Sequence, residues 1–316
     1  MNDPDMKPNS NFTIIYPTCG SVYLRWTLCS IASVLERGNY CGEILVITKD
    51  EIEASIVRNL YPDIRTLVLD IEKPGSWPGY MYKAVLLHQT RDIAITTKDN
   101  VMLLDSDILV YGDLNPLLNA VDRDLWIDRI YQQSKSKAYK PYVVQMCEQH
   151  GIDYDRDYYE YNSGCWNIPT AHYAEIMARY GELFYSSYKV DDRGKRIDWT
   201  DQPFFTLSCM LSGLKPKILK DRVEVKNRMN LVVAHGEEVG IKHFHGKHRR
   251  NKEEWQRAIE DEGFLEDLRV RSQTALNDAE HRYLWQDDYS SKTFFPCDAL
   301  HHRIWRKVKR FLYRSE

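Results

Sequence analysis

The chain has 316 residues, of which 43% are hydrophobic and 12% aromatic, and a formal net charge of −3. Such a length buries enough apolar surface to fold without structural metals or disulfides, and 43 basic residues against 46 acidic ones leave no global signal for nucleic acid. Seven scattered cysteines without a C-x-x-C pair predict neither a disulfide framework nor a cysteine zinc site. The N-terminus lacks a signal-peptide pattern, and no stretch approaches the roughly 18 apolar residues of a spanning helix, so we predict a cytoplasmic protein.

The first part of the chain alternates between short apolar runs and amphipathic segments. Apolar runs bounded by turn residues predict strands at 12–16, 44–48, 66–69 and 101–104. Apolar residues at helical spacing predict helices at about 21–35, 51–60 and 80–89, the first ending near Gly38. Continuously apolar strands that alternate with helices are typical of a parallel sheet covered on both faces, so we predict an α/β fold with a Rossmann-like, mostly parallel sheet.

The second part of the chain is less regular. It has Tyr-, Pro- and Asp-rich stretches and one further apolar segment at 204–211. A polar run from Asn251 is expected to be a helix that ends at Gly263, and the residues beyond it are expected to be helical.

The strongest chemical signal follows the strand at 101–104, where the sequence continues Asp105-Ser106-Asp107. A buried strand there delivers two carboxylates to the sheet edge at which ligands of such folds bind. Carboxylates together with substrate phosphates suit Mg²⁺ or Mn²⁺. The alternative is a strand that ends in an ordinary polar turn, because Asp and Ser both favour turns.

Two enzyme classes place an Asp-x-Asp motif after an apolar strand: the haloacid dehalogenase-like phosphatases, with the first Asp as nucleophile, and the nucleotide-sugar glycosyltransferases of the GT-A fold. In the phosphatases the motif lies on the first strand, and Thr or Val follows two residues after the second Asp. Here three predicted strands precede the motif and Leu109 holds that position. The position therefore favours the glycosyltransferases.

Several separated motifs between residues 12 and 250 resemble those of the family 8 glycosyltransferases, the group of glycogenin and the lipopolysaccharide galactosyltransferases. Their order and spacing match those of the family, and in chain order they are Tyr80-Met81-Tyr82-Lys83, Asp105-Ser106-Asp107, Tyr161-Asn162-Ser163-Gly164, Thr200-Asp201-Gln202-Pro203 and His243-Phe244-His245-Gly246-Lys247-His248-Arg249.

The resemblance implies a divalent metal, Mn²⁺ or Mg²⁺, held by Asp105, Asp107 and His243, with a UDP-sugar as the donor. His245 shares a strand face with His243 and is the alternative ligand. Arg249 stands where the family has a lysine that holds phosphate, and Lys247 is the alternative for that contact.

The other residues that the resemblance implies at the donor site come from several motifs. The resemblance gives Lys83 a role with the donor phosphates or sugar. The remaining donor-binding residues are expected to be Tyr16, Thr18, Tyr23, Ser106, Asn162 and Gly246. Family 8 enzymes retain the anomeric configuration. Asp201 and Gln202 are the candidates for the opposite sugar face, but neither is a convincing nucleophile, so we favour same-face attack assisted by the leaving phosphate.

The C-terminal tail has basic residues throughout 301–314, and Ile304, Trp305 and Val308 begin an apolar helical face. Such a helix can lie on an anionic membrane surface, which predicts peripheral association. The alternative is a helix that packs on the domain.

We therefore predict a GT-A enzyme of polysaccharide biosynthesis that moves glucose or galactose from a UDP-sugar to a glycan or lipid-linked saccharide. Residues 11–125 form its nucleotide-sugar-binding half, 126–260 its acceptor-binding and metal-completing half, and 261–316 a helical C-terminal region. The alternatives are a phosphatase that uses Asp105 and a degenerate, non-catalytic sugar-nucleotide-binding protein.

Overall fold

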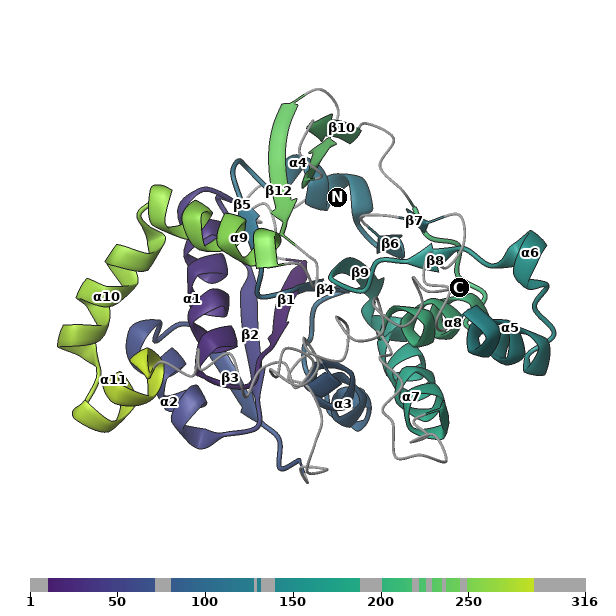
Figure 1. The fold of residues 1–316 in the computed structure, drawn as a ribbon, viewed down its shortest axis with the longest axis horizontal. Coiled ribbons are helices and arrows are strands. Elements are labelled where there is room, and N and C mark those ends of the chain that lie inside the picture. Colours follow the sequence, from purple (N-terminus) through teal and green to yellow (C-terminus); the bar gives the residue numbers. More distant parts are fainter. Residues whose placement is uncertain are drawn as a thin grey trace, which may run out of the picture.

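A computed structural model describes residues 11–71, 81–127, 130–131, 140–187, 201–217, 222–225, 229–234, 237–244 and 249–286. A six-stranded sheet in the order β3-β2-β1-β4-β9-β6 forms its centre (Figure 1). The strands of this sheet are β1 (Phe12–Pro17), β2 (Glu43–Thr48), β3 (Arg65–Val68), β4 (Asn100–Leu104), β6 (Trp126–Ile127) and β9 (Cys165–Pro169). The first four are parallel, and β9 runs antiparallel to both β4 and β6.

Helices cover both faces of this sheet, as the apolar strands predicted. The described helices of the first half are α1 (Ser21–Glu36), α2 (Glu51–Leu60), α3 (Met81–Gln89), the short 3₁₀ helix η1 (Thr90–Asp92) and α4 (Asn115–Val121). Those of the second half are α5 (Lys140–Gln149), α6 (Tyr154–Asp157), α7 (Thr170–Ser187), α8 (Gln202–Leu211), α9 (Arg249–Asp261), α10 (Phe264–Ala275) and α11 (Asp278–Trp285).

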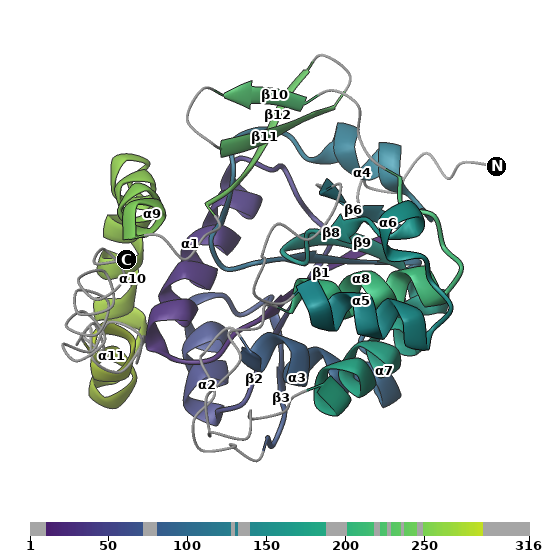
Figure 2. The same ribbon diagram turned by 45° about the vertical axis from the view of Figure 1, so that its right-hand side comes forward.

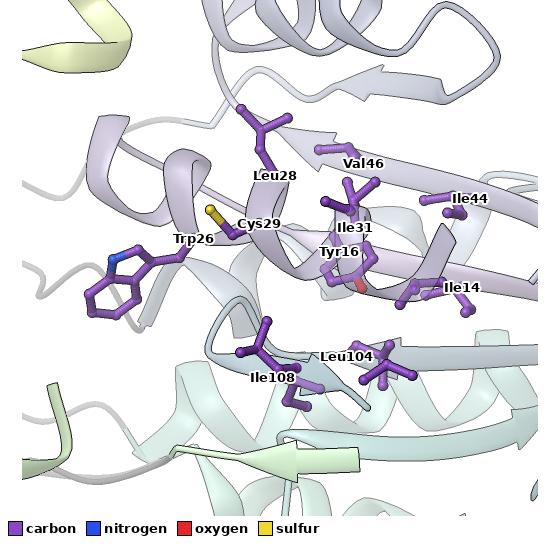
Figure 3. Close-up of a cluster of buried hydrophobic side chains, with 14 of the residues drawn as sticks. Ile14, Tyr16, Trp26, Leu28, Cys29, Ile31, Ile44, Val46, Leu104 and Ile108 are labelled. Atoms are coloured by element: carbon purple, nitrogen blue, oxygen red, sulfur yellow. The ribbon is translucent and has the colours of Figure 1, made fainter. Parts of the chain in front are cut away.

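Side chains alternate between two cores along each central strand. On β4, Met102 and Leu104 pack with α1, whereas Val101 and Leu103 belong to the core beneath α3, α7 and α8. Figure 3 shows the first of these cores, in which Leu28 and Ile31 of α1 lie over side chains of β1, β2 and β4. Successive side chains of an extended strand point to opposite faces of the sheet. Because the residues of these strands are mostly apolar, both faces of the sheet are apolar.

A second sheet, in the order β10-β11-β12-β5, was not predicted. It contains β5 (Ile108–Val110), β10 (Arg222–Val225), β11 (Met229–Ala234) and β12 (Glu237–His243), all antiparallel to their neighbours. A small pair, β7 (Ile130–Tyr131) and β8 (Glu160–Tyr161), completes the described strands. Strands β10, β11 and β12 lie together at the top of Figure 2, above the central sheet.

The helices α9 to α11 lie along the outer side of α1 and α2 (Figures 1 and 2). Gly263 ends the first of them in a left-handed conformation (φ 80°), which confirms the predicted stop. Arg25 of α1 is buried and donates to the carbonyl oxygen of Leu284 at 2.7 Å, while Glu53 of α2 accepts from the Tyr283 hydroxyl at 2.7 Å. These polar contacts fix α11 against the first half of the chain.

Within the described residues, no helix is both long and apolar enough to cross a membrane. The basic tail at 301–314 lies outside the described residues.

Candidate active site

The central strand β4 delivers the Asp-Ser-Asp motif to the carboxyl edge of the sheet. Beyond it the chain turns at Asp105, Ser106 and Asp107, and the N–H of Ile108 donates to the Asp105 carbonyl at 3.2 Å. All three residues of the motif are partly exposed. The chain then continues directly into β5, so the motif lies where the two sheets join.

Strand β12 brings His243 to this junction. It pairs with β5 so that His243 lies opposite Ile108, and the Phe244 N–H donates to the Asp107 carbonyl at 2.9 Å. The imidazole Nε2 lies 3.2 Å from Asp107 Oδ1 and 3.7 Å from Asp105 Oδ2. The side chain of His243 is only 6% exposed, so the surrounding residues hold its ring in place beside the two carboxylates.

These three side chains fit a divalent cation. One ligand atom from each of Asp105, Asp107 and His243 lies within 4.8 Å of the others, and no second such group occurs among the described residues. Two carboxylate oxygens and one imidazole nitrogen are acceptable ligands for Mn²⁺. Asp201 lies close by, so three carboxylates face the one ammonium of Lys83 and the imidazole. A cation would neutralise this excess of negative charge.

Gly164 keeps the space at this group open. A Cβ atom on Gly164 would lie 2.2 Å from His243 Cε1 and 2.6 Å from Asp105 Oδ2, distances that real Cβ atoms do not show. Strand β9 places the glycine there, since Cys165 pairs with Leu104 and the Asp105 N–H donates to the Gly164 carbonyl at 2.8 Å. Only a residue without a side chain is compatible with these positions of His243 and Asp105.

Replacing Gly164 by alanine is therefore expected to displace His243 and Asp105 and to remove Mn²⁺ binding, measured by calorimetric titration. The clash should also lower the free energy of unfolding by about 1–3 kcal/mol, the usual cost of overpacking. In a His243→Ala background the same substitution should cost less stability, because the ring that it meets is absent. An equal cost in both backgrounds would contradict the assigned clash.

Lys83 of α3 connects the candidate metal group to Asp201. Its ammonium lies 3.2 Å from Asp105 Oδ1 and 2.9 Å from Asp201 Oδ2, and it donates to Ser163 Oγ at 3.2 Å. The Lys83 side chain is 12% exposed, so it is not a solvated surface lysine. The ammonium of Lys83 on α3 therefore contacts residues from three other segments of the chain, namely Asp105, Ser163 and Asp201.

Burial and charge oppose each other within this network. Burial alone would lower the pKa of Lys83, but Asp105 and Asp201 outweigh it and raise that pKa. Burial raises the pKa of Asp105 despite the opposing charges of Lys83 and His243. For Asp201 burial is outweighed by Lys83 and by hydrogen bonds, so its pKa lies below the usual value. Asp201 is therefore an ionised partner of Lys83.

Asp201 is a poor candidate for a nucleophile in this arrangement. Its Oδ2 accepts from Ser163 Oγ at 2.8 Å and from the Tyr180 hydroxyl at 3.0 Å, in addition to the contact with Lys83. Three donors on one oxygen stabilise the charge that a nucleophile would have to share. In this arrangement Asp201 is a hydrogen-bonded partner of Lys83, Ser163 and Tyr180.

Three of the predicted donor-binding residues lie in or beside the loop after β1, which joins that strand to α1. The Tyr16 side chain is fully buried and its hydroxyl lies 3.0 Å from Ser30 Oγ, so only its backbone is left for a nucleotide. Thr18 is buried, and its N–H donates to the Ile47 carbonyl at 2.9 Å. Gly20, with φ 94°, precedes α1, and Tyr23 lies in the first turn of that helix.

The remaining predicted residues belong to the later motifs. Asn162 is buried, and its Oδ1 accepts from the Gly164 N–H at 2.7 Å, which shapes the turn before β9. Gln202 is partly buried and opens α8. Arg249 is the first residue of α9, where only the backbone is described, and the region 245–248, with His245, Gly246 and Lys247, lies outside the described residues.

Sequence reasoning assigned no role to Ser163, Gly164, Tyr180 or Glu160. Ser163 and Gly164 lie inside a quoted motif, and the small side chains between Asn162 and Cys165 could have pointed to them. Tyr180 is one of several buried tyrosines, and its spacing is that of any core aromatic. Glu160 carries no signal in the sequence that distinguishes it from the other acids.

Comparison with known proteins gives structural matches only. No protein-family model matches the sequence, and no curated protein matches it either. The structure of a galactosyltransferase, LgtC, in complex with donor and acceptor sugar analogues matches with 16% identity and a TM-score of 0.51, covering 84% of this chain and 98% of LgtC. The fold is that of the GT-A glycosyltransferases. This confirms the predicted fold class.

A second match to a GT-A protein is the glycosyltransferase GlyE of Streptococcus pneumoniae TIGR4, with 18% identity and a TM-score of 0.42. It covers 67% of this chain, and this chain spans 46% of GlyE.

Proposed function

We propose that this GT-A protein is a metal-dependent retaining glycosyltransferase that moves a hexose, glucose or galactose, from a UDP-sugar to a glycan or lipid-linked saccharide. The observation that carries the proposal is the group of Asp105, Asp107 and His243, with ligand atoms within 4.8 Å of one another, at the edge where such folds bind ligands. The order of the family 8 motifs in the sequence supports the choice of donor.

Each part of the site has a role in this proposal. A bound divalent ion would neutralise the charge that grows on the leaving nucleotide diphosphate. Lys83 holds Asp105 in place and keeps Asp201 ionised beside it. Because Asp201 is engaged by three donors, we favour attack of the acceptor from the same face as the leaving group. The partly exposed Ser106 and Gln202 would then contact the donor.

The test is thermal unfolding of the full chain with UDP, with and without Mn²⁺, and with GDP and dTDP as control nucleotides. We expect a rise in the midpoint only when UDP and Mn²⁺ are both present. At about 100 times its Kd a ligand adds about 2.7 kcal/mol, which raises the midpoint by several degrees. Hydrolysis of UDP-glucose and UDP-galactose would then identify the sugar.

Absence of a shift with every nucleotide would contradict the proposal. Release of phosphate from phosphate esters, with an aspartyl-phosphate at Asp105, would then identify the phosphatase alternative.

A further inference from the structure

The first turn of α8 is fixed against β8 by two hydrogen bonds. The Gln202 Nε2 donates to Glu160 Oε1 at 3.3 Å, and the Tyr161 N–H donates to Thr206 Oγ1 at 2.8 Å. Gln202 and Thr206 are four residues apart on the helix and therefore lie on the same side of it. Both bonds link neighbouring residues of β8 to this side of the helix, but only the bond to Glu160 holds the Gln202 side chain itself.

The bond to Glu160 also fixes which end of the Gln202 amide faces inward. The Glu160 side chain is buried, with the residue 3% exposed, and it accepts from the amide nitrogen. An amide has its donors on nitrogen and its acceptor on oxygen. With the nitrogen bonded to Glu160, the amide oxygen of Gln202 is not the atom that faces this carboxylate, and Gln202 itself is partly exposed.

We propose that Glu160 is a positioning residue that turns the amide oxygen of Gln202 toward the donor sugar. This inference rests on the proposed function. As the bond between sugar and phosphate breaks, positive charge grows at the anomeric carbon, and the negative end of an amide dipole stabilises it. Asp201 is less suited to this role because its Oδ2 already accepts from Lys83, Ser163 and Tyr180. Gln202 is its immediate neighbour.

The test compares three variants for hydrolysis of UDP-glucose and UDP-galactose in the presence of Mn²⁺. Glu160→Leu removes the acceptor, and we expect kcat to fall roughly ten- to a hundredfold, as for other outer hydrogen-bond partners. KM and the thermal shift with UDP and Mn²⁺ should stay as in the wild type. Glu160→Gln keeps an acceptor oxygen and should restore most of kcat.

The matched control is Thr206→Val, which removes the other bond between α8 and β8. It should lower the unfolding midpoint and leave kcat nearly unchanged. If Glu160→Leu keeps the wild-type kcat, the proposal is wrong. It is also wrong if Glu160→Leu loses kcat only in proportion to a loss of stability and nucleotide binding, because that is the result of a purely structural role.

A second measurement does not depend on turnover. In protein labelled with ¹⁵N-glutamine, the side-chain NH₂ of Gln202, identified by its loss in Gln202→Ala, should exchange with solvent more slowly than that of the exposed Gln149. Equal exchange rates would overturn the proposal even if every variant folds poorly. A wild-type protein with slow exchange at Gln202 but no cleavage of any UDP-sugar would instead contradict the proposed function.

Discussion

Replacement of Asp107 by asparagine is expected to abolish Mn²⁺-dependent turnover while the protein stays folded. Asparagine keeps the size of the side chain and the backbone carbonyl that accepts from Phe244, but it removes one of the two carboxylates nearest His243. In the proposed function Asp107 holds the ion that stabilises the leaving diphosphate, so its loss should lower kcat by at least roughly 10²–10³-fold. The rise in unfolding temperature with UDP and Mn²⁺ should disappear as well.

The matched control for this variant is Asp63→Asn, which removes an exposed carboxylate from the loop between α2 and β3. It should keep both turnover and the thermal shift. Without ligand, the midpoint of Asp107→Asn should lie close to that of the wild type, because one fewer negative charge faces Asp105 and Asp201. Full Mn²⁺-dependent activity in Asp107→Asn would remove Asp107 from the metal site.

Replacement of Lys83 by methionine is expected to destabilise the protein strongly at neutral pH. The substitution keeps an apolar stem but leaves Asp105 and Asp201 as neighbouring carboxylates without their ammonium partner. Removing one member of a buried ion pair costs about 3–5 kcal/mol. Urea unfolding of the variant and the wild type at pH 7 measures this loss, and Lys215→Met, at an exposed position, is the control.

The stability lost in Lys83→Met should decrease at acidic pH. In the wild type the pKa of Asp201 is held below its usual value, so the ionised carboxylate contributes stability above the unfolded pKa of about 3.9 and that contribution is lost as the pH falls. Methionine removes this contribution. The difference in the free energy of unfolding between wild type and variant should therefore be largest at neutral pH and narrow as the pH falls below about 4. A difference that stays constant with pH would contradict the ion-pair assignment.

Local sequence signals predicted the first half of the fold because its elements depend on neighbouring residues. The helix at 51–60 agrees with α2 at both ends, where Asp50 caps the first turn through the Ile52 N–H. The second sheet was missed because β5 has only three residues and its partner, β12, is partly polar and distant in sequence. Strand pairing of this kind is decided by tertiary contacts that periodicity does not record.

In the candidate site, too, local sequence signals predicted some residues, whereas others depend on tertiary contacts. The Asp-Ser-Asp motif follows a strand that its own apolar residues predict, whereas His243 was found only through the order of separated motifs. Tyr180 and Glu160 could not be predicted, because each acts through a partner on another element and neither differs locally from a core residue. The roles assigned to individual site residues and the three-part division of the chain stay predictions.

The contact between Arg25 and the Leu284 carbonyl has a consequence for the order in which the chain can assemble during its synthesis. The two residues are 259 positions apart. When the ribosome has released α1, the acceptor for the Arg25 guanidinium has not yet been made, and the same holds for the Tyr283 partner of Glu53, 230 positions away. Contacts between residues so far apart in the sequence form late, and they make folding slower. The packing of α1 and α2 against α11 should therefore form only after α11 has emerged from the ribosome.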